Sequence, residues 1–158
     1  MKEIRIKVFE KIRDIPYHIS ESVEDQGFRC WDKNRLLLNE FKKLGYEARL
    51  IVTKFSWDKQ SLPKDLVLQA PANHDVHPFV EIKIKGEWIR VDATLDKGFS
   101  NFNKWDGETD TSISINYDLI CTPEESMELN KKEDWSSKGE EWFVFGKKLN
   151  EFFKKIKN

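Results

Sequence analysis

The clearest pattern in the chain is an apolar stripe that begins at Cys30. From Trp31 to Gly45 the sequence reads WDKNRLLLNEFKKLG, in which apolar residues recur at intervals of three and four, as in an amphipathic helix. Gly45 supplies a stop signal at its end. The stripe consists of Cys30, Asn34, Leu37, Leu38, Phe41 and Leu44. The pattern therefore predicts a helix whose first turn directs the Cys30 thiol inward.

A second pattern predicts a β-hairpin. The segment HPFVEIKIKGEWIRVD, which starts at His77, alternates apolar and polar residues on both sides of Lys85 and Gly86. A two-residue turn there places Phe79 opposite Asp92, so that His77 and Asp92 become diagonal neighbours on one face. Such neighbours lie roughly 7–8 Å apart at the backbone, which lets the carboxylate reach the imidazole. A three-residue turn would put Asp92 on the wrong face, and the apolar alternation favours the first register.

The remaining periodic segments complete an α+β pattern. In chain order they predict a helix over 2–14, a strand over Glu47–Phe55, a strand over 112–120, a short helix from Pro123 capped by Thr122, and an amphipathic helix from Glu140. Long loops are expected over Ser56–Asp75, bordering the site, and over Phe99–Asp110. We therefore expect one domain spanning 1–158, with the Cys-bearing helix packed on an antiparallel sheet.

The C-terminal helix has two possible uses. Its apolar residues are spaced by three and four, and lysines occupy the other face. They are Trp142, Phe145, Leu149, Phe152 and Ile156. The stripe could bind a membrane or a partner, but packing on the domain's own sheet is the favoured interpretation.

Composition narrows the class of protein. The 27 basic and 28 acidic side chains nearly cancel, which argues against the concentrated positive charge of a nucleic-acid-binding surface. Two cysteines do not make a disulfide framework. Because no apolar leader follows Met1 and no long apolar span is present, we expect a cytoplasmic protein, not attached to a membrane, with reduced thiols and a monomeric state.

The thiol, the imidazole and the carboxylate are together the parts of a nucleophilic acyl-transfer site. The imidazole takes the proton of the thiol, and the carboxylate orients the imidazole. At a helix start, unpaired N–H groups and the helix dipole stabilise a thiolate at Cys30 and can also bind an oxyanion. The alternative for Cys30 is an ordinary buried cysteine. Its position near the helix start and the predicted hairpin favour catalysis.

These segments resemble the transglutaminase-like superfamily of papain-fold cysteine enzymes over about residues 1–95. VFEKIRDIPYHI is similar to the helix and "IPY" segment that precede the family's core. CWDKNRLLLNEFKKLGYEARLIV resembles its Cys helix and the next strand, and HPFVEIKIKGEWIRVDATLD resembles its hairpin. The resemblance implies a papain-like core in which Cys30 is the nucleophile, His77 the base and acid, and Asp92 the orienting carboxylate. Asn34 stands where the family often has a small residue.

Other residues have weaker claims to a role in the site. Gln26 could be an oxyanion donor or could bond locally in a turn, and Trp31 could contribute to the cleft or pack in the core. His74 is the main rival of His77 for the base. His74, Asp75 and His77 also resemble part of a zinc site, but structural zinc needs four ligands with paired short spacings. We expect no metal.

The functional prediction is a cysteine-dependent amide or peptide hydrolase, or an acyl transferase, that works through a thioester. It needs no cofactor and acts on a protein, a peptide or a small amide. Hydrolysis is favoured over transfer to an amine, because water competes strongly unless a site excludes it. The alternative is a catalytically silent transglutaminase-like module that binds a peptide in the same cleft.

Overall fold

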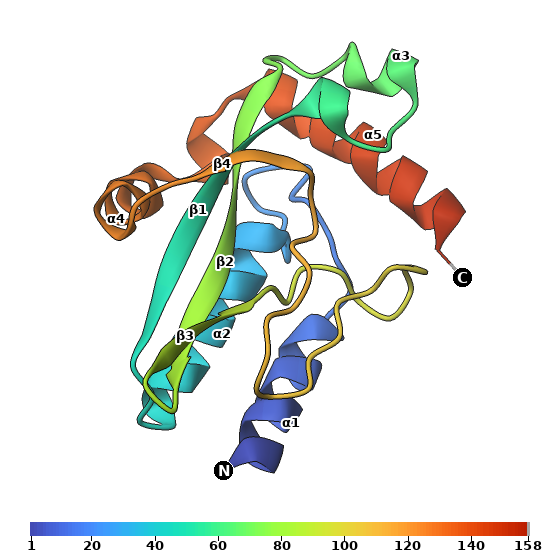
Figure 1. Cartoon of the computed structure of the whole chain (residues 1–158). Helices are drawn as coiled ribbons and strands as arrows, with labels where there is room; N and C mark the ends of the chain where they lie inside the picture. The colour runs from blue at the N-terminus through green and yellow to red at the C-terminus, as the bar shows by residue number, and fades with distance from the viewer. Residues whose placement is uncertain (158) are drawn as a thin grey trace.

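The protein has an α+β fold in which helices surround a four-stranded antiparallel sheet of order β3-β2-β1-β4 (Figure 1). The structure is a computed structural model and describes residues 1–157. Its α-helices are α1 (Lys2–Arg13), α2 (Cys30–Lys43), α3 (Lys64–Val67), α4 (Pro123–Lys132) and α5 (Glu140–Ile156). Its strands are β1 (Ala48–Ser56), β2 (His74–Ile84), β3 (Glu87–Val91) and β4 (Tyr117–Ile120). Two short 3₁₀ helices are η1 (Trp57–Lys59) and η2 (Trp135–Ser137).

The predicted turn and register are confirmed from Val80–Val91 to Ile84–Glu87, but the pairing ends there, short of the predicted pair of Phe79 and Asp92. Val80 pairs with Val91 and Ile84 pairs with Glu87, so Lys85 and Gly86 form the two-residue turn. Both turn residues have positive φ, 51° and 82°, as the tight turn that matches strand twist requires. The register keeps the apolar residues of β2 and β3 on one face of the hairpin.

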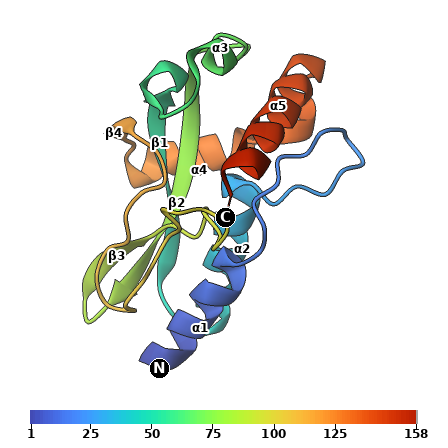
Figure 2. The same cartoon turned by 90° about the vertical axis from the view of Figure 1, so that its right-hand side faces the viewer.

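The main core lies between that face and α2. Figures 1 and 2 show α2 against the sheet and α1 beside α2. The packing side chains are Phe9 and Ile12 from α1, Leu37, Leu38 and Phe41 from α2, and Leu50, Val52, Val80, Ile82 and Val91 from the strands. The helix forms because its sequence carries this stripe at helical spacing. The first turn of α2, with Cys30, therefore lies at one end of the core.

The prediction that the C-terminal stripe packs on the domain's own sheet was wrong in one respect. The helix α5 does pack on the domain, but not on the sheet. Phe145 and Leu149 are buried against Ile19, Trp57 and Leu66, because the segment after β1 folds into η1 and α3 and supplies apolar side chains. Figure 2 shows α5 standing apart from the strands. None of the helices within residues 1–157 is long and apolar enough to cross a membrane.

Two further boundaries differ from the sequence prediction. The strand β2 begins at His74, inside the expected loop Ser56–Asp75. The strand expected over 112–120 is regular only from Tyr117, because earlier backbone groups bond to side chains, as when Ser114 N donates to Asp92. The short helix α4 is confirmed, and the Thr122 hydroxyl accepts a hydrogen bond from its first turn.

Candidate active site

The candidate site lies at the edge of β2, beyond the end of β3. The pairing of the two strands stops at Val80 and Val91, so the earlier part of β2 has no partner on that side. Pro78 lies in this part of the strand, where a residue without an N–H is tolerated. Its carbonyl accepts a hydrogen bond from the Asn34 amide of α2 at 3.3 Å. The chain that leaves β3 brings Asp92 to the same edge.

His77 and Asp92 form a buried hydrogen-bonded pair. His77 Nε2 lies 2.8 Å from Asp92 Oδ2, and the two residues are 2% and 0% exposed. The other carboxylate oxygen accepts bonds from the Thr94 hydroxyl at 2.5 Å and the Thr94 N–H at 3.0 Å. Ser114 N donates to Oδ2 at 2.9 Å. These donors hold an ionised carboxylate in a site without water contact.

Each residue of the pair stabilises the charged form of the other. Burial lowers the pKa of His77, but the Asp92 carboxylate and the nearby Cys30 thiol outweigh it and raise that pKa well above 6.5. Burial likewise raises the pKa of Asp92, but His77, Thr94 and Ser114 lower it well below 3.8. At neutral pH the pair is therefore an imidazolium and a carboxylate.

Cys30 is the first residue of α2 and lines a cavity of about 500 Å³ together with His77. The thiol is half-buried. Because Nε2 of His77 faces Asp92, Nδ1 is the ring nitrogen left for the thiol. The N–H of Arg29, which precedes the helix, is capped by Asp32 at 3.2 Å. The thiol therefore lies at a helix start, on the same cavity as His77.

Asn34 connects the thiol-bearing helix to the carboxylate. One turn after Cys30, its amide donates to the Cys30 carbonyl at 2.9 Å, to the Thr94 hydroxyl at 3.1 Å and to Asp92 at 3.3 Å. Its oxygen accepts a bond from Ala93 N at 3.1 Å. The sequence pattern places Asn34 on the apolar stripe but does not predict this role. The signal was a polar residue on a buried face, which needs polar partners there.

Lys33 supports the same region and was missed. The residue is fully buried, and its ammonium donates to the carbonyls of Arg13, Ile15 and Thr94, each at 2.8 Å. Burial lowers the pKa of Lys33 to about 8. The three bonds fix the end of α1 and the chain after Asp92 on the start of α2. No pattern in the sequence indicates this burial, because lysine is usually exposed.

Tyr17 was also missed. Its neighbour His18 forms a β-bridge with Phe28, which brings Tyr17 beside the start of α2. The ring lines the cavity with Cys30. Burial, followed by the Cys30 charge, raises the pKa of Tyr17 well above 10, so the hydroxyl keeps its proton. Only the IPY segment around it was noted in the sequence.

The structure does not bring the two tentative oxyanion or substrate-binding residues into the cavity. Gln26 is exposed, and its amide donates to the adjacent Gly27 carbonyl at 3.0 Å, which is the local alternative. Trp31 is 1% exposed and belongs to the main core, with the Arg35 guanidinium 5.0 Å from its ring centroid. The geometry favours the local alternative for Gln26 and core packing for Trp31.

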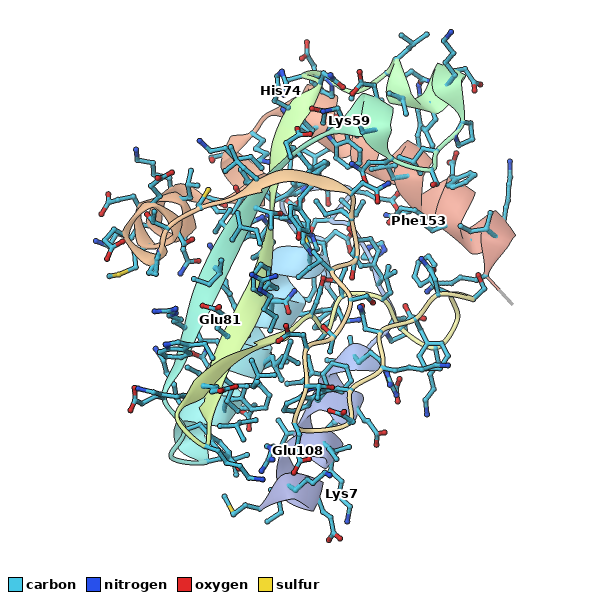
Figure 3. All side chains as sticks on the ribbon, viewed as in Figure 1. Lys7, Lys59, His74, Glu81, Glu108 and Phe153 are labelled. Carbon is cyan, nitrogen blue, oxygen red and sulfur yellow. The ribbon has the colours of Figure 1, made fainter. Side chains whose placement is uncertain are left out.

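The rival histidine and the second cysteine lie elsewhere. Figure 3 shows His74 at the outer end of β2, where its Nδ1 lies 3.4 Å from the Ser56 hydroxyl. Cys121 is buried, and burial raises the pKa of its thiol. Within residues 1–157 no group of three His, Cys, Asp or Glu side chains is placed to hold a metal ion.

Comparisons of the chain with protein-family models, with curated proteins and with solved structures found no match. What the protein does must therefore be argued from this site.

Proposed function

We propose that the protein is a cysteine-dependent amide or peptide hydrolase with a papain-like, transglutaminase-like core. Cys30 is its nucleophile, His77 its base and acid, and Asp92 its orienting carboxylate. The observation that carries this proposal is the buried His77–Asp92 pair at 2.8 Å, on a cavity that Cys30 also lines. Such a trio has the parts and the polarity that thiol catalysis requires.

Because His77 is an imidazolium at neutral pH, the reaction begins from the form in which the Cys30 proton already resides on His77 and the thiolate lies beside the imidazolium. The sulfur attacks the substrate carbonyl carbon, and the oxyanion is bound by free N–H groups at the start of α2. When the carbon–nitrogen bond breaks, His77 returns the proton to the leaving amine. Water, deprotonated by His77, then attacks the thioester, and cleavage of the carbon–sulfur bond yields a carboxylic acid and the free thiol.

Hydrolysis is favoured over transfer to an amine. Cys30 is half-buried and lies on a cavity, so water can reach the thioester. Bulk water is present at about 55 M, and an amine wins only if a site holds it in position. The described residues contain no feature that we can assign to binding an amine.

Thiol labelling provides the first test, because Cys121 is an internal control. Cys30 should react with iodoacetamide at neutral pH at least about tenfold faster than Cys121, since the thiolate is the reactive form. His77→Ala should slow labelling of Cys30 and leave Cys121 unchanged. Mass spectrometry of the labelled peptides gives both rates. Equal, slow labelling of the two cysteines would favour the silent binding module.

Product analysis provides the second test. The protein is incubated with a glutamine-containing peptide library, with and without a labelled primary amine, and Cys30→Ala is the control. We expect Cys30-dependent hydrolysis products with little amine incorporation. Predominant Cys30-dependent incorporation would instead show an acyl transferase.

A further inference from the structure

The cavity beside Cys30 also indicates which substrates fit. We propose that it binds a large apolar side chain, aromatic or aliphatic, on the acyl part of the substrate, next to the carbonyl that Cys30 attacks. This inference rests on the proposed function and names a substrate class for it. A volume of about 500 Å³ lies within the range of pockets that enclose small ligands.

One wall of the cavity is a cluster of three aromatic rings. The centroid of the Tyr17 ring lies 6.4 Å from that of Phe99 and 5.6 Å from that of Phe153. Phe99 and Phe153 are 5.6 Å apart. All three pairs meet edge to face, the arrangement that aromatic rings prefer. Since these residues also line the cavity with Cys30, the wall is an apolar surface in the same cavity as the thiol.

The helix α5 holds a second wall in place. Leu149, Phe152 and Ile156 line the cavity from this helix. Beyond its end, the Lys157 ammonium binds the Asp96 carboxylate at 2.8 Å, and the same carboxylate accepts a bond from Tyr17 N at 2.6 Å. The apolar stripe of α5 therefore has a use that the sequence alone did not suggest, because part of it faces the cavity.

The charged groups at the cavity do not favour an ionic substrate side chain. Arg29 and Asp75 line it, but each already has a partner. Arg29 binds Glu133 at 2.7 Å, and Asp75 lies 3.5 Å from the Lys138 ammonium. A charged side chain would leave water without gaining a free counter-charge, which is unfavourable. An apolar side chain has no such cost.

The test compares p-nitrophenyl esters of N-acetylphenylalanine, N-acetylglycine and N-acetylglutamate with the wild-type protein. Rates with Cys30→Ala are subtracted. We expect kcat/KM for the phenylalanine ester to exceed that for the glycine ester at least about tenfold, the scale of discrimination by apolar pockets. The glutamate ester should be no better than the glycine ester. Cys30-dependent rates within about twofold of one another would overturn the inference and leave the proposed function standing.

Substitutions on α5 test whether the cavity causes the preference for the phenylalanine ester. Phe152→Ala should lower the ratio of the phenylalanine to the glycine ester to about threefold or less. Ile156→Glu, at a position that is 49% exposed and therefore tolerant, should lower the same ratio by placing a charge at the cavity. Val144→Ala is the matched control, because Val144 is 48% exposed on the same helix and does not line the cavity. An unchanged ratio in both cavity variants would contradict the assignment.

A binding measurement tests the preferred substrate side chain independently of the cleavage reaction. In Cys30→Ala, NMR titration with N-acetylphenylalanine amide should give a Kd at least about tenfold lower than with N-acetylglycine amide. If this preference holds although no ester is cleaved in a Cys30-dependent way, the proposed hydrolase fails and the apolar site stands. Equal affinities would overturn the apolar site whatever the enzyme does.

Discussion

The two halves of the continuous strand β2 have different neighbours and are stabilised by different interactions. From Val80 to Ile84 the strand lies between β1 and β3, and its even-numbered residues fill the apolar core. From His74 to Phe79 it pairs with β1 but not with β3, and polar groups occupy the free edge. Burial of apolar area stabilises the first half, whereas satisfied hydrogen bonds and the ion pairs of His77 with Asp92 and of Asp75 with Lys138 stabilise the second.

This difference shows how a small domain can place a buried charge pair. The short strand β3 frees one side of β2, and the Asn34 amide bonds there to the Pro78 carbonyl, which a longer strand would cover. Loss of either member of the His77–Asp92 pair would destabilise the fold, because an unpaired buried charge is strongly unfavourable. The neighbouring apolar half supplies the rigidity that keeps the polar groups in register.

The largest effect is expected from Asp92→Asn. The amide cannot hold the imidazolium, so Cys30-dependent hydrolysis should fall by about a thousandfold or more. The free energy of unfolding should fall by about 3–5 kcal/mol, because a buried charge loses its partner. Ester kinetics and urea denaturation measure the two effects.

Glu81→Gln is the matched control, because Glu81 lies on the half of β2 that pairs with β3, whereas Asp92 binds His77 on the other half. Glu81 binds Arg49 at 2.8 Å, but the pair is partly exposed, so its loss should change stability by less than about 1 kcal/mol. Activity should stay within twofold. Equal effects of the two substitutions would show that the halves of β2 are not distinct.

Ile82→Ala should lower the free energy of unfolding strongly without changing the reactivity of Cys30. Ile82 is 0% exposed in the main core, and its truncation should cost about 2–5 kcal/mol. In the folded fraction, the iodoacetamide rate of Cys30 should remain that of the wild type. Urea denaturation followed by labelling below the transition tests both points, and a slower thiol would show that the core half tunes the site directly.

Sequence patterns were sufficient to predict the apolar half of β2, from Val80 to Ile84. Its register depends on one two-residue turn and on strict alternation, which a single sequence displays. The same register brought His77 and Asp92 to one edge, so their contact was predictable as well. Cys30 was placed correctly at the start of α2 because the stripe begins there.

The polar half could be predicted only in part. Lys33 and Tyr17 reach the site through contacts between distant segments, with Thr94 and with the start of α2, and no local pattern encodes these contacts. Gln26 and Trp31 were considered for the site because they are near Cys30 in sequence. Helix geometry turns Trp31 into the core, while a turn leaves Gln26 outside. Sequence proximity is thus a poor guide to a cavity built from separate elements.

A smaller effect is expected from pH. The pKa of His77 is raised above 6.5, so its contribution to stability is complete below about 6.5 and declines as pH rises toward the raised value. The pKa of Asp92 is lowered below 3.8, so its contribution is complete above about 3.8 and declines as pH falls. The stability difference between the wild type and Asp92→Asn should therefore be largest near pH 4–6.5.

Urea denaturation of both proteins from pH 3 to 9 measures that difference. It should shrink by more than about 1 kcal/mol toward each end of this range. Glu81→Gln should show no such maximum. A difference that stays constant with pH would mean that the pair is not ionised in the folded protein.

The smallest effect is expected from Pro78→Ala. Pro78 lies where β3 has ended, and its carbonyl already has the Asn34 amide. The new N–H would find no strand partner and would be left to water or a weak contact, while the unfolded chain gains freedom. Together these should cost about 0.4–1 kcal/mol. If β3 instead extended to pair with the new N–H, stability would rise, and the shift would be visible as slow exchange of the new amide at position 78, whereas the Asp92 N–H, which donates to Thr111, should not change. That outcome would show that proline itself, and not the path of the chain after Val91, keeps the edge of β2 free for the site.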